Sequence, residues 1–405
     1  MPTTEAFHGV RVFQAGQTTR PIAVGEYSTI GAVVVAPAAE EDKFPLNVAT
    51  TIFSNDTAMR TALGAGGNVD AVLDAIDDQG VVAEVQVVRV EEGAGADDAA
   101  KLEATIANIV GSGANNSGVH AFKEASKPAK LLICPGYTSQ RISDAKNPVA
   151  AELDGIATRL RAMKILDTPD ASKEVAEAYR EDFTDDKRAY LFHPSAKVLV
   201  ATSVVTQPGS GRAAGLFVKR DKEVGGPFES PSSQAMGGIL GPSRPISYYT
   251  GEPDSEAQYL NSKQITTLRG GFILWGNRTC ALDPKDAFVN VVRTNDMIDE
   301  AVINAFYWAL DRNISVPLGT SILQSLDAFG DELVAKGAVL GFRPWFEKEL
   351  NANEGMSSGI LRFDFDRLAA SPLEDLQFGV HDNLTYYATV ANGILVALDR
   401  QSGAA

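Results

Sequence analysis

The sequence predicts a multi-domain protein of mixed α/β and α+β class, with a central, mainly parallel sheet flanked by helices. A chain of 405 residues exceeds what one ordinary hydrophobic core accommodates. Its 44% apolar and 22% charged residues are typical of globular proteins. Strand-like and helix-like patterns alternate after residue 98, which favours parallel strands connected by helices. We expect an N-terminal arm strand (1–20), a small α+β domain (21–97), a central α/β domain (98–265) and a C-terminal domain (266–405).

Composition argues against several classes of protein. The net charge of −16 disfavours binding to nucleic acid or to an anionic membrane surface. This acidity serves solubility, or it keeps free subunits apart until assembly is nucleated. Cys134 and Cys280 lie in apolar strand-like contexts and are expected to be buried thiols. No signal peptide or apolar run of about 18 residues is recognised, so we expect a soluble protein made in the cytoplasm.

The N-terminal arm has the pattern of a lone strand. Val10 and Val12 fall on one face and Arg11 on the other, with Phe13 following. Such a strand needs a sheet to join. It pairs either with its own chain or, by strand addition, with a neighbouring subunit.

The small α+β domain should contain two strands and two helices. An apolar run at 28–36 and an alternating run at 81–90 indicate strands, and 56–63 and 68–78 indicate helices. In the second strand, alternation directs Val81, Ala83, Val85 and Val87 to one face and Glu84, Gln86 and Arg89 towards water. The acidic turn at 93–98 marks the domain boundary.

The central domain should alternate helices and strands. Helices are expected at 99–110, 148–164 and 172–182, and strands at 130–134, 165–167, 188–193 and 197–201.

The C-terminal domain begins with residues 267–311, the stretch whose sequence pattern predicts secondary structure most clearly. An apolar run at 272–275 and a β-rich run at 287–292 indicate two strands. Asn295 is a suitable N-cap for a long helix that follows. This stretch contains no nucleophile, acid–base pair or metal cluster, so it is built for packing.

Later in this domain we expect a helix at 321–336, capped by Thr320, and strands at 359–366, 375–380 and 384–390. One face of the helix carries Asp327, Asp331 and Glu332. This face is either solvated or docks a basic or hydrogen-bonding partner.

Catalytic patterns are not found. The sequence has no G-x-S-x-G, H-E-x-x-H or Walker A motif, and its four histidines lack metal-ligand spacing. His193 is expected to be structural. Residues 209–214 fit G-x-G-x-x-A loosely, but Pro208 precedes them and no acidic residue follows at the required distance. We therefore expect no cofactor, no metal and no catalytic residue.

Several stretches resemble contractile tail sheath proteins, the sheaths of contractile-tailed phages and R-type bacteriocins. The most specific are LRGGFILWGNRT (268–279), NDMIDEA (295–301) and GPSRPI (241–246). Cys280 and Ala281 depart from the more polar residues expected there. The signature core comprises Gly271, Leu274, Trp275, Gly276, Asn277 and Arg278.

The resemblance implies a structural protein of the virion tail, assembled in the bacterial cytoplasm. Its subunits would form a six-fold helical homo-oligomer of stacked rings around a tail tube, and would contract from a metastable state to drive the tube through the host envelope. Partners would be the tube protein and the baseplate and tail terminator proteins, with residues 21–97 facing outward. The implied contact residues are an N-terminal arm (Val10, Arg11, Val12, Phe13), a C-terminal arm (Leu384, Tyr386, Ala388, Val390) and a tube-docking helix (Gln324, Asp327, Asp331, Glu332).

Two other functions remain open from the residues alone. One is a nucleotide-dependent oxidoreductase that uses the central α/β domain. The other is a non-contractile capsid or tube protein with one stable diameter.

Overall fold

A computed structural model describes residues 20–252 and 254–402, and side chains through Arg400. The chain divides into two compact units, Met1–Pro372 and Leu373–Ala405, which are described separately. The predicted arm at Val10–Phe13 lies outside the described residues. Within the described ranges, no helix has the length and apolar character needed to cross a membrane.

The first unit is built on an eight-stranded sheet with the order β11-β10-β6-β5-β4-β1-β3-β2. Its strands are β1 (Ile30–Val35), β2 (Ala49–Phe53), β3 (Glu84–Val90), β4 (Leu131–Ile133), β5 (Met163–Asp167), β6 (Ala189–Phe192), β10 (Ile265–Arg269) and β11 (Ile273–Trp275). All neighbours pair in parallel except β2–β3 and β10–β11. The central, mainly parallel sheet is therefore confirmed. The segments 21–97 and 98–265 both contribute strands to this sheet, so the described part of segment 21–97 does not form a sheet of its own.

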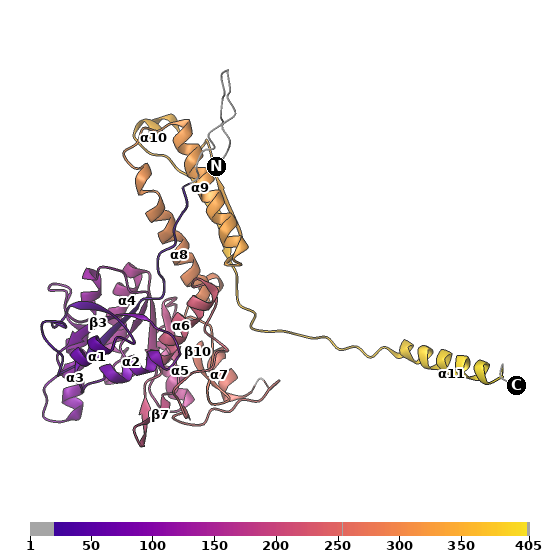
Figure 1. The fold of residues 1–405 in the computed structure, drawn as a ribbon, viewed down its shortest axis with the longest axis horizontal. Coiled ribbons are helices and arrows are strands. Elements are labelled where there is room, and N and C mark those ends of the chain that lie inside the picture. Colours follow the sequence, from indigo (N-terminus) through magenta and orange to yellow (C-terminus); the bar gives the residue numbers. More distant parts are fainter. Residues whose placement is uncertain (1–19, 253, 403–405) are drawn as a thin grey trace, which may run out of the picture. The chain divides into compact units, whose positions relative to one another are not determined.

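Helices cover both faces of this sheet (Figure 1). They are α1 (Thr57–Leu63), α2 (Val69–Asp77), α3 (Asp98–Val110), α4 (Pro148–Leu160), α5 (Lys173–Glu181), α6 (Ser210–Val224) and α7 (Glu256–Ser262), with 3-10 turns η1 (Gly118–Glu124), η2 (Ile142–Asp144) and η3 (Pro284–Asp286). Residues of α2 and α6 pack in one core, and residues of α3, α4 and α5 pack in the other. We call this sheet with its helices the α/β body.

Strand β3 differs from the prediction in where its polar side chains lie. Glu84, Gln86 and Arg89 are all buried instead of facing water. The reason is that β3 lies between β1 and β2, inside the sheet, with both faces covered. Each polar side chain finds a partner there: Glu84 pairs with Lys127 at 3.0 Å, and Arg89 donates to the Ala39 carbonyl at 3.0 Å.

Helix α8 (Val289–Ala305) includes most of the segment predicted as a strand at 287–292. Phe288 is its N-cap and Asn295 lies inside it, so both of those predictions are wrong. Val289 and Val292, one turn apart, are buried in the core of the body. This packing outweighs the β propensity of the valines, which is a weak preference. A 3-10 turn, η4 (Tyr307–Ala309), follows.

A second group of elements packs around its own core. This core contains residues of α8, α9 (Val316–Ala335), β12 (Val339–Trp345) and β13 (Asp364–Ala369), and the short helix α10 (Asn353–Ser357) lies between the two strands in the sequence. We call α9, β12, α10 and β13, together with the distal half of α8, the helix-hairpin module. Helix α9 begins at the cap Ser315 instead of Thr320, and β13 begins later than the predicted strand at 359–366. A small sheet, β8-β7-β9, is formed by β7 (Ala196–Val200), β8 (Ser203–Gln207) and β9 (Gly241–Pro242).

The second unit holds η5 (Leu384–Tyr386) and α11 (Tyr387–Ser402) after an extended segment (Figure 1). The strand predicted at 384–390 is therefore wrong. Tyr386 and Tyr387 favour a strand, but the segment after them is rich in alanine and leucine, which are strong helix formers. The segment predicted as a strand at 375–380 has no secondary structure.

Candidate assembly interface

Strands β12 and β13 form a two-stranded antiparallel sheet. Each strand pairs only with the other among the described residues, so each has an outer edge without a strand partner. Leu340 and Leu368 are 69% and 62% exposed on this hairpin. A strand edge with free backbone groups is a template for adding another strand.

The hairpin is held in place by α9. Phe329 of α9 is buried, and Phe342 of β12 stacks on Phe365 of β13 with ring centroids 4.9 Å apart. Gly330 allows this close approach, because a Cβ atom there would lie 2.3 Å from the Phe342 ring. The edges of the hairpin therefore belong to a packed element.

The opposite face of α9 is polar and open. The four predicted docking residues, Gln324, Asp327, Asp331 and Glu332, are all exposed. Asp327 and Asp331 are one helical turn apart, and Glu332 pairs with Lys336 at 2.6 Å. All four residues therefore lie on the exposed side of α9. This exposure is compatible both with a solvated face and with a docking face.

The chain enters the described region beside this same module. The backbone N–H of Arg20 donates to Ser325 Oγ of α9 at 3.3 Å, and the Arg20 guanidinium lies 4.2 Å from the centroid of the Trp308 ring. The chain leaves the first unit at Pro372, just after β13. Arg20, the first described residue, and Pro372, the last residue of the first unit, therefore both lie at the module.

The second unit exposes apolar side chains in an alternating pattern. Leu376, Phe378 and Val380 are 62%, 81% and 87% exposed. An alternation of period two in an extended segment is the pattern of a strand that buries one face. The predicted C-terminal arm residues Leu384, Tyr386, Ala388 and Val390 are also exposed, but they lie in η5 and α11.

The signature stretch has a packing role. Strand β11 pairs with β10, and the Trp275 ring lies 4.2 Å from the Arg269 guanidinium. Leu274 is fully buried, and Gly276, at φ 147°, leaves no room for a Cβ beside Thr266. The remaining signature residues lie in the loops around β11. Gly271 has φ +90°, and the Asn277 carbonyl accepts a hydrogen bond from the Val289 N–H at 3.0 Å. Arg278 forms an isolated antiparallel β-bridge with Phe288. The stretch thus joins the edge of the sheet to the start of α8.

The glycine-rich segment at 209–214 forms the N-cap and first turn of α6, a helix that the sequence pattern did not predict. Asp167 Oδ1 accepts from the N–H groups of Gly209 and Ser210, both at 2.8 Å, and Oδ2 accepts from Ser210 Oγ. Burial raises the pKa of Asp167 to about 6, against the opposing effect of these hydrogen bonds. An internal carboxylate therefore occupies the anion site that a phosphate would need at this helix terminus.

His193 is structural, as expected. It is fully buried, and its Nδ1 and Nε2 lie 2.7 Å from Thr168 Oγ1 and 2.8 Å from Arg244 Nη2. Burial, together with the nearby Arg244 charge, lowers its pKa to about 4. Cys134 and Cys280 are buried free thiols whose pKa burial raises to about 12. None of these groups is poised to react.

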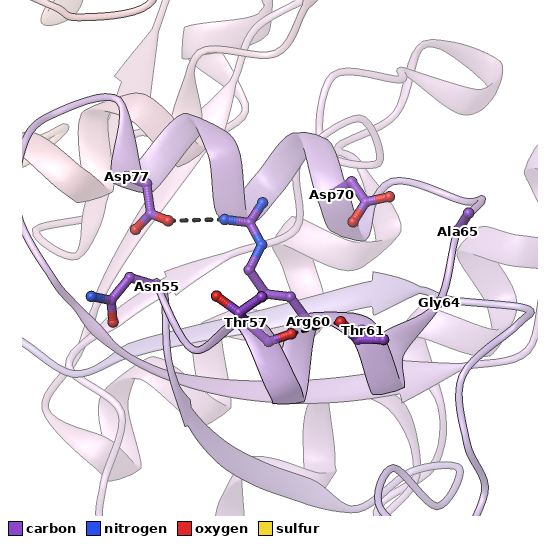
Figure 2. Close-up of a pocket in the computed structure, with 8 residues that line it drawn as sticks. All are labelled: Asn55, Thr57, Arg60, Thr61, Gly64, Ala65, Asp70 and Asp77. Carbon is purple, nitrogen blue, oxygen red and sulfur yellow. Dashed lines mark hydrogen bonds and ion pairs between the residues drawn. The ribbon is translucent and has the colours of Figure 1, made fainter.

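A surface pocket of about 510 Å³ lies between α1 and α2 (Figure 2). Arg60 projects into it and pairs with Asp77 at 2.9 Å and with Asp74. The pocket is open, and its charges are largely matched by one another. It contains no nucleophile beside a general base and offers no catalytic arrangement.

Comparison with known proteins decides the family. A prophage major tail sheath protein of Pseudomonas aeruginosa (strain UCBPP-PA14) is 32% identical over 383 residues, which cover 92% of this chain and 96% of that protein. The tail sheath protein of Escherichia phage P2 is 31% identical over 400 residues, covering 96% of this chain and 98% of that protein. The chain belongs to the tail sheath protein family. No protein-family model matches it.

Solved structures agree on the fold. A contracted sheath complex of the extracellular contractile injection system PVC gives a TM-score of 0.68 at 14% identity and covers 95% of this chain and 99% of that one. A chain of the contracted baseplate of the anti-feeding prophage gives a TM-score of 0.69 at 14% identity, over 94% and 98%. The predicted membership and the α/β fold are thus confirmed. As a member of this family, the chain is a structural subunit of a contractile tail sheath, and the oxidoreductase alternative finds no support.

Proposed function

We propose that this sheath protein polymerises as stacked six-fold rings around a tail tube, and that contraction from a metastable extended lattice drives the tube through the host envelope. Subunit contacts would be heterologous, closing laterally and remaining open along the axis. The sheath would form part of the virion tail and assemble in the host cytoplasm. The tube, baseplate and tail terminator proteins would be its partners, and residues 21–97 would face outward.

The observation that carries this proposal is that Arg20 and the end of the first unit, Pro372, both lie at the helix-hairpin module, whose two strands have open outer edges. The N-terminal segment leads into Arg20 on α9, and the C-terminal unit follows β13. Strands supplied by neighbouring subunits would complete the β12–β13 sheet. In this scheme Val10–Phe13 form one donated strand. Leu376, Phe378 and Val380 replace residues 384–390 as the other, because they alternate and are exposed.

The exposed face of α9 is the proposed contact with the tube. Gln324, Asp327, Asp331 and Glu332 offer carboxylates and an amide to basic or hydrogen-bonding groups. Such contacts are individually weak and salt-dependent, which suits a surface that must release during contraction.

Electron microscopy of the purified full-length chain tests this proposal. Hollow tubes are expected, alone or after co-expression with the tube protein, and two distinct tube diameters would distinguish a contractile sheath from a rigid one. Deletion of residues 1–13 should leave folded monomers that form no tubes. A matched control replaces Val10 and Val12 with isoleucine, which keeps the strand pattern and should assemble. Normal tubes from the deletion would contradict the strand-donation scheme.

A further inference from the structure

Three cations lie in a row along one edge of the α/β body. Lys130 and Arg188 directly precede β4 and β6, and Arg161 precedes β5 by two residues. These three strands are neighbours and run parallel, so their amino ends meet at the same edge of the sheet. Residues far apart in the sequence are thereby placed side by side.

Helix α8 presents three carboxylates to this row. Asp296, Asp299 and Glu300 are spaced to lie on one face of the helix. Arg188 binds Asp296 through two hydrogen bonds of 2.7 and 3.0 Å. Lys130 Nζ lies 2.5 Å from Glu300 Oε2.

The third carboxylate, that of Asp299, lies between the two parts of the unit. It is 3.7 Å from Arg161 of the body and 2.5 Å from Arg367 of β13 in the module. The Tyr27 hydroxyl, just before β1, lies 2.5 Å from Glu300 Oε2 and 2.9 Å from the Asp296 carbonyl oxygen, within hydrogen-bonding distance of both. The joint is therefore a network of polar contacts.

This network lies where α8 passes between two hydrophobic cores. Val289 and Val292 are in the core of the body, whereas Met297, Ile298 and Ala301 are in the core of the module. Hydrophobic contact is non-directional, so by itself it fixes the orientation of two packed surfaces less strictly than ion pairs do. Ion pairs do not tolerate sliding, since a shift of one helical turn, about 5.4 Å, would separate the hydrogen-bonded pairs Arg188–Asp296 and Lys130–Glu300 and the looser pair Arg161–Asp299.

We propose that Asp296, Asp299 and Glu300, paired with Arg188, Arg161 and Lys130, form a charge joint that sets the orientation of the helix-hairpin module on the α/β body. This inference rests on the proposed function for its purpose: the joint makes each subunit move as one lever, so that a rotation of the body displaces the strands donated to the module. These are positioning residues. Their proposed role is internal to one subunit.

Distance measurements on the free full-length chain test the joint directly. Spin labels are placed at Glu103→Cys on α3 and Ala335→Cys on α9, both exposed positions. The native Cys134 and Cys280 are fully buried, so labelling is selective. The unaltered joint should give one narrow distance distribution by double electron–electron resonance.

Reversing one charge should open the joint. Asp296→Arg is expected to broaden the distribution and to raise hydrogen exchange in residues 294–304 about a hundredfold, because it leaves buried like charges together. Asp299→Lys is a milder second variant, since Asp299 is 39% exposed, and it should broaden the distribution less. The control Glu40→Lys reverses an exposed pair with Lys43 and should change neither readout.

Charge exchange separates pairing from simple packing. Arg188→Asp combined with Asp296→Arg should restore the narrow distribution and the slow exchange, which a purely steric role would not predict. A narrow distribution in both single reversals would overturn the proposal, as would a broad one in the exchanged variant. Electron microscopy of the same variants reports on assembly separately. If the unaltered chain forms no tubes, the proposed function fails, while the distance measurements still decide the joint.

Discussion

The buried pair between Asp221 of α6 and Arg293 of α8 provides the sharpest test of what stabilises the first unit. Their side chains are 2% and 3% exposed. Arg293 donates to Asp221 at 2.8 and 2.5 Å and to the Tyr27 carbonyl at 2.9 Å, and Ser28 Oγ also donates to Asp221. Asp221→Ala would leave the guanidinium buried with only one of these partners.

Removing one member of a buried pair costs about 3–5 kcal/mol, because the remaining charge is uncompensated. This is a large fraction of an ordinary stability of about 5–15 kcal/mol. Replacing both members with apolar residues of similar size, as in Asp221→Leu with Arg293→Met, should cost far less. Urea unfolding followed by tryptophan fluorescence measures both effects.

The exposed pair Glu40–Lys43 supplies the control, since Glu40→Ala should change stability by less than about 1 kcal/mol. The reasoning is refuted if Asp221→Ala costs no more than this control. It is also refuted if the double variant is as unstable as the single one, because the loss would then come from packing and not from an unpaired charge.

Two further predictions follow from other parts of the chain. Asp167→Asn should make stability fall more steeply as pH is lowered from 6.5 to 4.5. The lowered pKa of His193 destabilises the fold at acid pH, whereas the raised pKa of Asp167 offsets this loss of stability by up to about 3 kcal/mol. Urea unfolding at both pH values measures how stability changes with pH. An unchanged pH dependence in the variant would contradict this prediction. Phe378→Asp should abolish tube formation without changing the thermal midpoint, because Phe378 is 81% exposed in the isolated chain. Calorimetry and electron microscopy check this, with Gln377→Asp as the control, and normal tubes from Phe378→Asp would exclude the segment from the contact.

The sequence alone predicted those elements whose signals are local. The apolar run around β1 is fully buried, and α1 begins at the cap Asp56 and is followed by Gly64. The alternation of strands and helices was sufficient to infer a mainly parallel sheet, because parallel neighbours need crossover helices. The resemblance carried by 268–279 led to the family that the comparisons confirmed.

Other features were decided by tertiary structure. The polar residues of β3 are buried because packed elements cover both faces of the sheet in which β3 is an internal strand. The start of α8 is helical because Val289 and Val292 enter the body core, although local propensity favours a strand. The exposed helix α11 was missed because two tyrosines obscured the helix formers that follow them.

The charge joint shows most clearly what a sequence conceals. Lys130 and Glu300 are 170 residues apart, and Arg188 and Asp296 are 108 apart. Nothing local distinguishes these residues from the charged residues of a solvated surface. They meet only because parallel pairing aligns the amino ends of β4, β5 and β6, and because α8 presents its carboxylates to that edge. The residues themselves supply the charges, but the order of the strands decides which charges become partners.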